Sequence, residues 1–292
     1  MKIDRRPLLA AFAAGLLARP ASAQGSDSTP PGFAGKVFIN EAGGVRLHTY
    51  LAPPAGALVT SHLIETDDGL VLVDGQFQPG PALELGRYIA ATGRPLRKVL
   101  LSHAHPDHWL GFHHLGRPAV HAGPATAAFL RANAAAIVAQ RGADSSPPEI
   151  AGVVTEGAET VGGVELRYRL VADTEAPEML VVEVPRAGAL IVQDQFYNRV
   201  HAVVSRQIDN WVAALEGIIA GGAATPLILA GHGEPASPAG LPDAIAYLRG
   251  VQPLMAAPGA DRQRIAADME AAFPTWRLRP LLELGLSRSL PG

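Results

Sequence analysis

The sequence contains no cysteine among its 292 residues. This absence excludes disulfide bonds, thiolate metal sites and cysteine nucleophiles. Any bound metal must therefore be held by histidine and carboxylate side chains. Charged residues make up only 17% of the chain, with 24 basic and 27 acidic side chains. Because the formal net charge is −3, the chain offers no basic surface for nucleic acid, and we expect no nucleic-acid partner.

Long apolar runs and internal repeats are also missing. No segment reaches the roughly 18 uninterrupted apolar residues of a membrane span, so we expect no stable membrane insertion. No period of about 20 to 50 residues recurs, which excludes repeat architectures. The hydrophobic fraction is nevertheless 48%, which allows a sizeable buried core and excludes a disordered chain.

The first residues are typical of an export signal. Basic residues that include Arg5 and Arg6 precede the uncharged run 8–18, and the small-residue sequence Ala-Ser-Ala follows at 21–23. We therefore expect residues 1–23 to be a signal peptide, removed from a periplasmic or secreted protein. The arginine pair with the Pro-Leu-Leu that follows it resembles a twin-arginine export signal.

The remainder predicts a flexible leader over 24–35, rich in Ser, Gly and Pro, and one folded domain over 36–292 that ends in helices. Residues 58–65 and 70–74 predict a β-hairpin, because Asp68-Gly69 can supply the positive φ of a tight turn. The other predicted strands are 98–101, 161–171, 179–184, 189–192 and 227–230, and the predicted helices are 81–92, 124–141, 208–219, 241–254 and 261–273, with a loop at 142–148. This order favours a layered sandwich of two sheets with helices outside.

The chemistry is concentrated in one short segment, Ser-His-Ala-His-Pro-Asp-His at 102–108. If the segment is extended, His103 and His105 point to the same side, so both imidazoles can reach one metal ion. Asp107 and His108 follow where the loop turns and can serve a second metal ion. The segment therefore predicts a metal site at the end of a strand.

This motif resembles the central metal-binding motif of the metallo-β-lactamase superfamily. Residues 227–235 resemble the strand and loop that present the last histidine of that family, and 70–75 resemble its early strand pair. The resemblance implies an α+β fold, a four-layer αβ/βα sandwich with one active site at the sheet edge. It also implies a centre of two Zn²⁺ ions per chain and usually hydrolysis. Nitrogen and oxygen ligands leave Mn²⁺ and Fe²⁺ open.

The third ligand of the first metal departs from the common pattern of the family. Most members place a histidine just before the strand that corresponds to 179–184, and this chain has none there. Counting back from Leu180 puts Glu175 at that position, and a similar Thr-Glu-Ala-Pro stretch carries a metal-binding glutamate in the alkylsulfatase branch. The neighbouring Glu178 is the alternative.

Two further ligands are implied by the resemblance. Asp194 stands at a strand end where members commonly carry a Gly-Asp pair whose carboxylate bridges both metals, although Gln193 here replaces the glycine. His232 follows a strand and lies between two glycines. The implied ligands are thus His103, His105 and Glu175 for the first metal, Asp107, His108 and His232 for the second, and Asp194 between them.

Other residues near the motifs are candidates for supporting roles. Asp74, at a strand end, could orient a ligating imidazole or could cap a turn. Trp109, Tyr197 and His201 are candidates for the wall of a substrate pocket, although buried aromatic side chains more often belong to a core. Asp107 is also our candidate catalytic residue, as a proton relay to the leaving group.

The sequence therefore predicts a secreted metal-dependent hydrolase of a small-molecule substrate. A hydroxide between two metals would attack an ester-like or amide-like bond, in a lactone, a thioester, a β-lactam or a sulfate ester. One alternative is an iron-dependent sulfur dioxygenase of the same fold, and another is a metal-binding protein without catalytic activity. The oligomeric state stays open.

Overall fold

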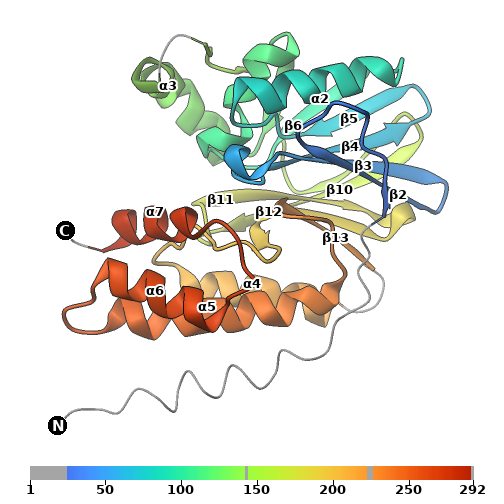
Figure 1. Cartoon of the computed structure of the whole chain (residues 1–292). Helices are drawn as coiled ribbons and strands as arrows, with labels where there is room; N and C mark the ends of the chain where they lie inside the picture. The colour runs from blue at the N-terminus through green and yellow to red at the C-terminus, as the bar shows by residue number, and fades with distance from the viewer. Residues whose placement is uncertain (1–24, 142–143, 222–225, 291–292) are drawn as a thin grey trace.

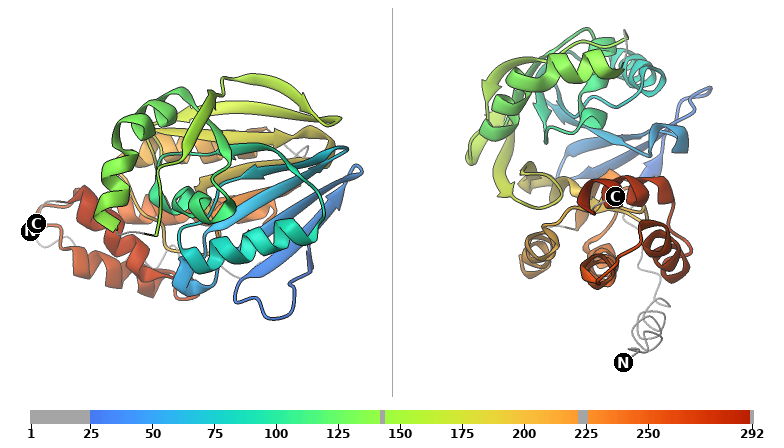
Figure 2. Two further views of the ribbon diagram at one scale, coloured as in Figure 1. Left: turned by 90° about the horizontal axis from the view of Figure 1, so that it is seen from above. Right: turned by 90° about the vertical axis from the view of Figure 1, so that its left-hand side faces the viewer.

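The computed structural model describes residues 25–141, 144–221 and 226–290 (Figure 1). Two β-sheets lie face to face, with helices on the outer face of each (Figure 1). The right view of Figure 2 shows the same layers from another side: α2 and α3 lie above one sheet, and the C-terminal helices lie below the other. The expected four-layer sandwich of α+β type is confirmed. The expected signal peptide, 1–23, lies outside the described residues.

The first sheet is built from the N-terminal half of the chain, and its eight strands follow one another in sequence order. Pairing is antiparallel from β1 to β5 and parallel from β5 to β8. The strands are β1 (Ser26–Asp27), β2 (Lys36–Ala42), β3 (Val45–Leu51), β4 (Thr60–Thr66), β5 (Gly69–Val73), β6 (Leu96–Leu101), β7 (Ala119–Ala122) and β8 (Glu149–Val153).

Two features of this sheet bear on the sequence-based expectations. The leader predicted as flexible at 24–35 contains β1, which pairs with β2 through Ser26 and Asp27. The hairpin β4–β5 forms as predicted, but neither Asp68 nor Gly69 has a positive φ. The Thr66 hydroxyl instead closes the turn by donating to the Gly69 carbonyl (3.0 Å).

The second sheet has the order β13-β12-β11-β10-β9 and is antiparallel except for the parallel pair β12–β13. Its strands are β9 (Gly157–Val161), β10 (Val164–Ala172), β11 (Glu178–Val184), β12 (Ala189–Tyr197) and β13 (Leu227–His232). The predicted strand 161–171 corresponds to β10, which begins only at Val164 because Gly162 and Gly163 take positive φ and form the turn from β9, a strand that the sequence-based prediction missed.

The helices have the following bounds: α2 (Pro79–Ala91), α3 (Pro124–Arg141), α4 (Ile208–Ala220), α5 (Leu241–Ala256), α6 (Arg262–Ala272) and α7 (Arg279–Ser289). Short 3₁₀ helices are η1 (Pro54–Gly56), η2 (Pro106–His108), η3 (Leu110–Leu115), η4 (Pro185–Ala187) and η5 (Pro238–Gly240). The sequence-based prediction missed α7, which buries Leu282 and Leu286. Within the described ranges, no helix combines the length and apolarity that crossing a membrane requires.

The core is divided by the sheets into three apolar clusters. One lies between the sheets and includes Val73, Leu100, Leu180 and Leu229, all fully buried. The second joins the first sheet to α2 and α3, and the third joins the second sheet to the C-terminal helices. Burying one such side chain contributes about 1.5 to 3 kcal/mol, so the cluster between the sheets holds them together and the other two hold the helices on their outer faces.

Strand direction gathers the chemical motifs at one edge of the sandwich. β5 and β6 are parallel, so Asp74 and Ser102, which directly follow them, lie side by side. β12 and β13 are parallel as well, which brings Asp194 next to the end of β13 at His232. The two sheets meet here, because the Leu180 N–H donates to the Ser102 carbonyl (2.7 Å).

Candidate metal centre

Two groups of histidine and carboxylate side chains converge at this edge. The first cluster consists of His103, His105, Glu175 and Asp194, and the second cluster of Asp107, His108, Asp194 and His232. In each cluster, one ligand atom from every residue lies within 4.8 Å of the others. Asp194 belongs to both clusters. All seven residues that the sequence nominated as ligands are therefore brought together.

The first cluster is formed by the segment after β6 and the loop between β10 and β11. Glu175 Oε1 lies 3.1 Å from His105 Nδ1, and Glu175 Oε2 lies 3.7 Å from His103 Nε2. Asp194 Oδ2 lies 3.8 Å from His103 Nε2. These separations exceed ordinary hydrogen-bond lengths except for the first, and they leave room for a cation among the donor atoms.

The second cluster is arranged around the other side of Asp194. His108 Nε2 lies 3.2 Å from Asp194 Oδ1, and His232 Nε2 lies 3.3 Å from Asp194 Oδ2. Asp107 Oδ2 lies 3.4 Å from His232 Nε2. The two oxygens of Asp194 thus face the two histidines of this cluster. Asp194 Oδ2 also faces His103 of the first cluster.

Glu178, the alternative to Glu175, has a different place. Its carboxylate oxygens accept hydrogen bonds from the backbone N–H groups of Ala125 and Thr126 (3.1 and 2.9 Å), at the start of α3. An acidic group at a helix N-terminus satisfies free N–H donors and interacts favourably with the helix dipole. The structure therefore brings Glu175, and not Glu178, to the first cluster.

Three of the histidines point Nε2 into the clusters and are held in this orientation by a hydrogen bond at Nδ1. His108 Nδ1 donates to Asp74 Oδ2 (2.8 Å), and His232 Nδ1 donates to the Ala57 carbonyl (2.7 Å). His103 Nδ1 lies 2.9 Å from the Ser102 hydroxyl, which itself donates to Asp74. Because Nδ1 carries the proton, the Nε2 lone pair of each ring faces the clusters. Asp74 therefore orients an imidazole, one of its two predicted roles.

The inward atoms of the clusters have no hydrogen-bond partner. This holds for Nε2 of His103, His108 and His232, for both carboxylate oxygens of Glu175 and for Asp194 Oδ1, all buried. An unsatisfied buried polar group costs about 1 to 3 kcal/mol, so six of them at one place need a common partner. Divalent cations satisfy nitrogen and oxygen donors together, and the residues present therefore fit a metal centre.

The electrostatics of the clusters support the same conclusion. Although burial disfavours an imidazolium, the carboxylates of Asp194 and Asp107 raise the pKa of His232 to about 10. Burial alone would raise the pKa of Asp194, but the neighbouring His108 and His232 hold it well below its usual value. A proton on His232 thus helps to balance the carboxylates in the absence of a cation. Metal binding must displace this proton, so the affinity must rise with pH.

The comparisons with known proteins agree with this geometry. The sequence model of the metallo-beta-lactamase superfamily matches residues 55–236, more than half of the chain. The chain belongs to the metallo-β-lactamase superfamily. No curated protein matches it in sequence.

Several solved structures of the superfamily share the fold. A metallo-beta-lactamase from Pontibacter korlensis has 18% identity and a TM-score of 0.57, with 73% of this chain and 99% of that chain covered. The metallo-beta-lactamase FIM-1 from Pseudomonas aeruginosa, in its mono-zinc form, has 15% identity and a TM-score of 0.55, with 74% and 96% covered. The sec-alkylsulfatase Pisa1 from Pseudomonas sp. has 19% identity and a TM-score of 0.56; the match covers 82% of this chain but only 48% of that one.

Access to the candidate metal centre is one-sided. The side chains of His105 and Asp107 are 26% and 24% exposed, whereas the side chains of the other five cluster residues are at most 1% exposed. A small molecule can therefore approach only past His105 and Asp107. The deep side is closed by Tyr197, whose hydroxyl donates to Asp194 Oδ2 (2.7 Å) and whose ring stacks on that of His232.

The predicted wall residues are only partly in place. Tyr197 lies at the centre, and its direct contact with a substrate stays a prediction. Trp109 is fully buried in the core between the first sheet and helices α2 and α3, where its indole N–H donates to the Ala104 carbonyl (3.0 Å) and supports the motif loop. His201 is buried against Tyr247 and Trp276 beneath the second sheet. Trp109 and His201 therefore offer no surface to a substrate, which corrects our expectation.

Sequence reasoning also missed two members of the site. Ser102 joins His103 to Asp74, and Gln193 contacts Asp74 from the second sheet. Ser102 directly precedes His103, and a hydroxyl next to a predicted ligand could have indicated a residue that orients it. Gln193 could be found only as the residue that replaces an expected glycine.

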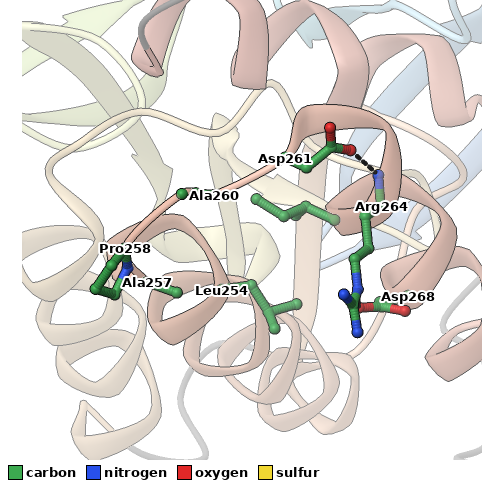
Figure 3. Close-up of a pocket in the computed structure, with 9 residues that line it drawn as sticks. Leu254, Ala257, Pro258, Ala260, Asp261, Arg264 and Asp268 are labelled. Carbon is green, nitrogen blue, oxygen red and sulfur yellow. Dashed lines mark hydrogen bonds and ion pairs between the residues drawn. The ribbon is translucent and has the colours of Figure 1, made fainter.

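A cavity elsewhere in the molecule is separate from this centre. It has a volume of about 90 Å³ and lies between the end of α5 and the start of α6 (Figure 3). Leu254, Ile265, Arg264, Asp261 and Asp268 are among its lining residues, and none of the cluster residues lines it. Asp261 caps α6 by accepting from the Arg264 N–H (2.7 Å), so its carboxylate already has a structural role.

Proposed function

We propose that the protein is a hydrolase that depends on two divalent metal ions, most simply Zn²⁺. One observation carries this proposal: seven buried or half-buried ligands form two clusters that share Asp194, and six of their inward atoms have no hydrogen-bond partner. His103, His105 and Glu175 would hold the first ion. Asp107, His108 and His232 would hold the second, with Asp194 common to both. Mn²⁺ and Fe²⁺ also suit these nitrogen and oxygen donors.

Two bound cations supply a water nucleophile of lowered pKa and an electrophile for the scissile group. The chain contributes the orientation of the ligands, through Asp74 and Ser102, and the exclusion of water from the deep side, through Tyr197. Asp107 lies on the open side, with its side chain 24% exposed, and is the carboxylate best placed to carry a proton to a leaving group. No side-chain nucleophile is needed.

The substrate that we propose is a small molecule with an ester-like or amide-like bond, such as a lactone, a thioester, a β-lactam or a sulfate ester. Structural neighbours that are named as beta-lactamases and as an alkylsulfatase support this range. Their identities to this chain are at most 19%, so they support the range and not one member of it.

Two alternatives make different predictions about the metal. A sulfur dioxygenase would hold one iron and consume oxygen with a persulfide. The second cluster is as complete as the first, which favours two ions. A metal-binding protein without activity would need no open side, whereas His105 and Asp107 are accessible here.

The test is metal analysis of the purified protein combined with a substrate panel. The panel contains nitrocefin, lactones, thioesters, aryl phosphates and alkyl sulfates, each assayed before and after treatment with a chelator and after addition of Zn²⁺ or Mn²⁺. We expect two metal ions per chain and hydrolysis of at least one ester-like or amide-like substrate, lost on chelation and restored by metal. One iron per chain with oxygen uptake, or metal without any turnover, would overturn the proposal.

We also propose that the protein is exported, on the evidence of its first 23 residues alone. The purified periplasmic form should begin near Gln24, as measured by mass spectrometry. If export uses the twin-arginine route, replacing Arg5 and Arg6 by lysine should retain the precursor in the cytoplasm. Unchanged export would indicate the general secretory route instead.

A further inference from the structure

Gln193 has a backbone conformation that its residue type disfavours. Its φ is +45°, in the left-handed region that suits glycine, and its side chain is fully buried. The register between β12 and β13 shifts at this residue, directly before Asp194. A long polar side chain at a strained and buried position needs stabilising contacts.

The side chain of Gln193 connects the two sheets. Its amide nitrogen donates to Asp74 Oδ2, at the end of β5, and its amide oxygen accepts from His62 Nε2 (3.0 Å), on β4. His62 Nε2 must carry the proton, because it also faces the Ala230 carbonyl (3.2 Å). Its Nδ1 then accepts from the Thr49 hydroxyl (3.0 Å).

The chain of hydrogen bonds continues into the metal centre. Asp74 Oδ2 also accepts from His108 Nδ1, and Asp74 Oδ1 accepts from the Ser102 N–H (2.8 Å). The residues Thr49, His62, Gln193, Asp74 and His108 are each at most 1% exposed. One continuous hydrogen-bonded path therefore runs from the first sheet, through β12, to a ligand of the second cluster.

We propose that Gln193 and His62 are positioning residues of the metal centre. The Gln193 amide N–H shares Asp74 Oδ2 with His108 and so fixes the rotation of this carboxylate. His62 fixes the Gln193 amide in turn, because an N–H donor pairs with the oxygen of that amide and not with its nitrogen. The Nε2 lone pair of His108 is then held toward the second cluster. This inference rests on the metal centre of the proposed function.

The experiment compares substitutions at two glutamines that flank Asp194. Gln193→Met and His62→Phe remove the hydrogen bonds to Asp74 and to Gln193, while Gln195→Met is the matched control. The Gln195 side chain is equally buried on β12, but it lines a small cavity next to Trp211 and Tyr247 and its amide nitrogen has no partner. Metal affinity is measured by competition with a chromophoric chelator, and ligand geometry by the visible spectrum of the Co²⁺-loaded protein.

We expect Gln193→Met and His62→Phe to weaken binding of one metal equivalent by about 10- to 100-fold and to change the Co²⁺ spectrum, with Gln195→Met unchanged. Gln193→Gly separates positioning from packing. Glycine relaxes the positive φ, so the metal-free protein should melt at a temperature close to that of the wild type while metal affinity still falls. Wild-type affinity and an unchanged spectrum in Gln193→Met and Gln193→Gly would overturn the inference.

A readout without metal keeps this result distinct from a failure of the proposed function. In the metal-free protein, the proton on His108 Nδ1 is observed by NMR through its hydrogen bond to Asp74. We expect its chemical shift to move in Gln193→Met and to stay in Gln195→Met. If the wild type binds no metal, the proposed function fails, and an unmoved proton signal in Gln193→Met would overturn the positioning role independently.

Discussion

The Glu175 carboxylate lies 3.1 Å from His105 Nδ1, whereas the Glu178 carboxylate accepts hydrogen bonds from the start of α3. The two glutamates are three residues apart, but Glu175 belongs to the loop before β11 and Glu178 is the first residue of that strand. Pairing of β11 with β10 fixes Glu178 opposite Ala172. Loop and strand thus direct two identical side chains to different partners.

Substitution of these two glutamates should therefore give different defects. Glu175→Gln removes a negative ligand from the first cluster, and we expect it to lower the metal content to about one ion per chain after dialysis. Glu178→Gln should keep both ions and lower the free energy of unfolding by about 1 kcal/mol, because the start of α3 loses a charged cap. Metal analysis and urea unfolding measure the two effects. Metal loss in Glu178→Gln alone would contradict the assignment.

Asp107→Ala and His232→Ala should each empty the second cluster and leave the protein folded. Each substitution removes one of the ligands on that side, while the first cluster keeps its own. We expect at least a 100-fold loss of activity toward any substrate that the wild type hydrolyses. His114→Ala, in η3 and outside both clusters, is the control. Near-normal turnover with unchanged metal content in both variants would refute the model with two ions.

Gly231→Ala, in strand β13 of the second sheet, should displace Asp194 and so disrupt both clusters. A Cβ atom at Gly231 would lie 1.9 Å from Asp194 Oδ1, so Asp194 must move away from both clusters. We expect weaker binding of both metal ions, measured by chelator competition. Gly217→Ala, on the exposed face of α4 with no atom within 4 Å of the added Cβ, should keep the metals and stabilise the fold by about 0.5 to 1 kcal/mol. Full metal affinity in Gly231→Ala would show that Asp194 is not held as described.

His201 should make the fold sensitive to acid. Burial lowers the pKa of His201 to about 4, below the value of about 6.5 in an unfolded chain. Between these two values the unfolded state binds a proton that the folded state does not, so stability falls as the pH decreases. From pH 7 to 4.5 the loss from this residue is about 2 kcal/mol.

The variant His201→Phe has no imidazole to protonate at this position. Its unfolding free energy should therefore fall by about 2 kcal/mol less than that of the wild type between pH 7 and 4.5. Phenylalanine suits the contacts with Tyr247 and Trp276. Urea unfolding at several pH values measures the slope, with His114→Phe as the control histidine outside this aromatic cluster. An unchanged slope in His201→Phe would mean that the pKa of His201 is the same in the folded and unfolded states.

The sequence alone determined the local part of the centre. His103, His105, Asp107 and His108 occupy one segment directly after a strand, so their spacing limits where their side chains can point. The alternation of apolar strands and amphipathic helices likewise indicated a layered sandwich, because periodicity reports which face of each element is buried. The strand before His232 was predictable for the same reason.

Only the tertiary structure decided the contacts between distant segments. Whether Glu175 or Glu178 enters the first cluster depends on where β11 begins, which is a matter of strand pairing and not of composition. Asp74 and Gln193 meet across 119 positions of sequence, because the two sheets pack face to face there. Packing of helices and loops on the outer faces of the sheets buries Trp109 and His201, which the sequence offered as candidates for a pocket wall. The local sequence pattern indicates which side chains of a segment can bind a metal ion. Strand register and packing between the sheets determine which distant residues those side chains contact.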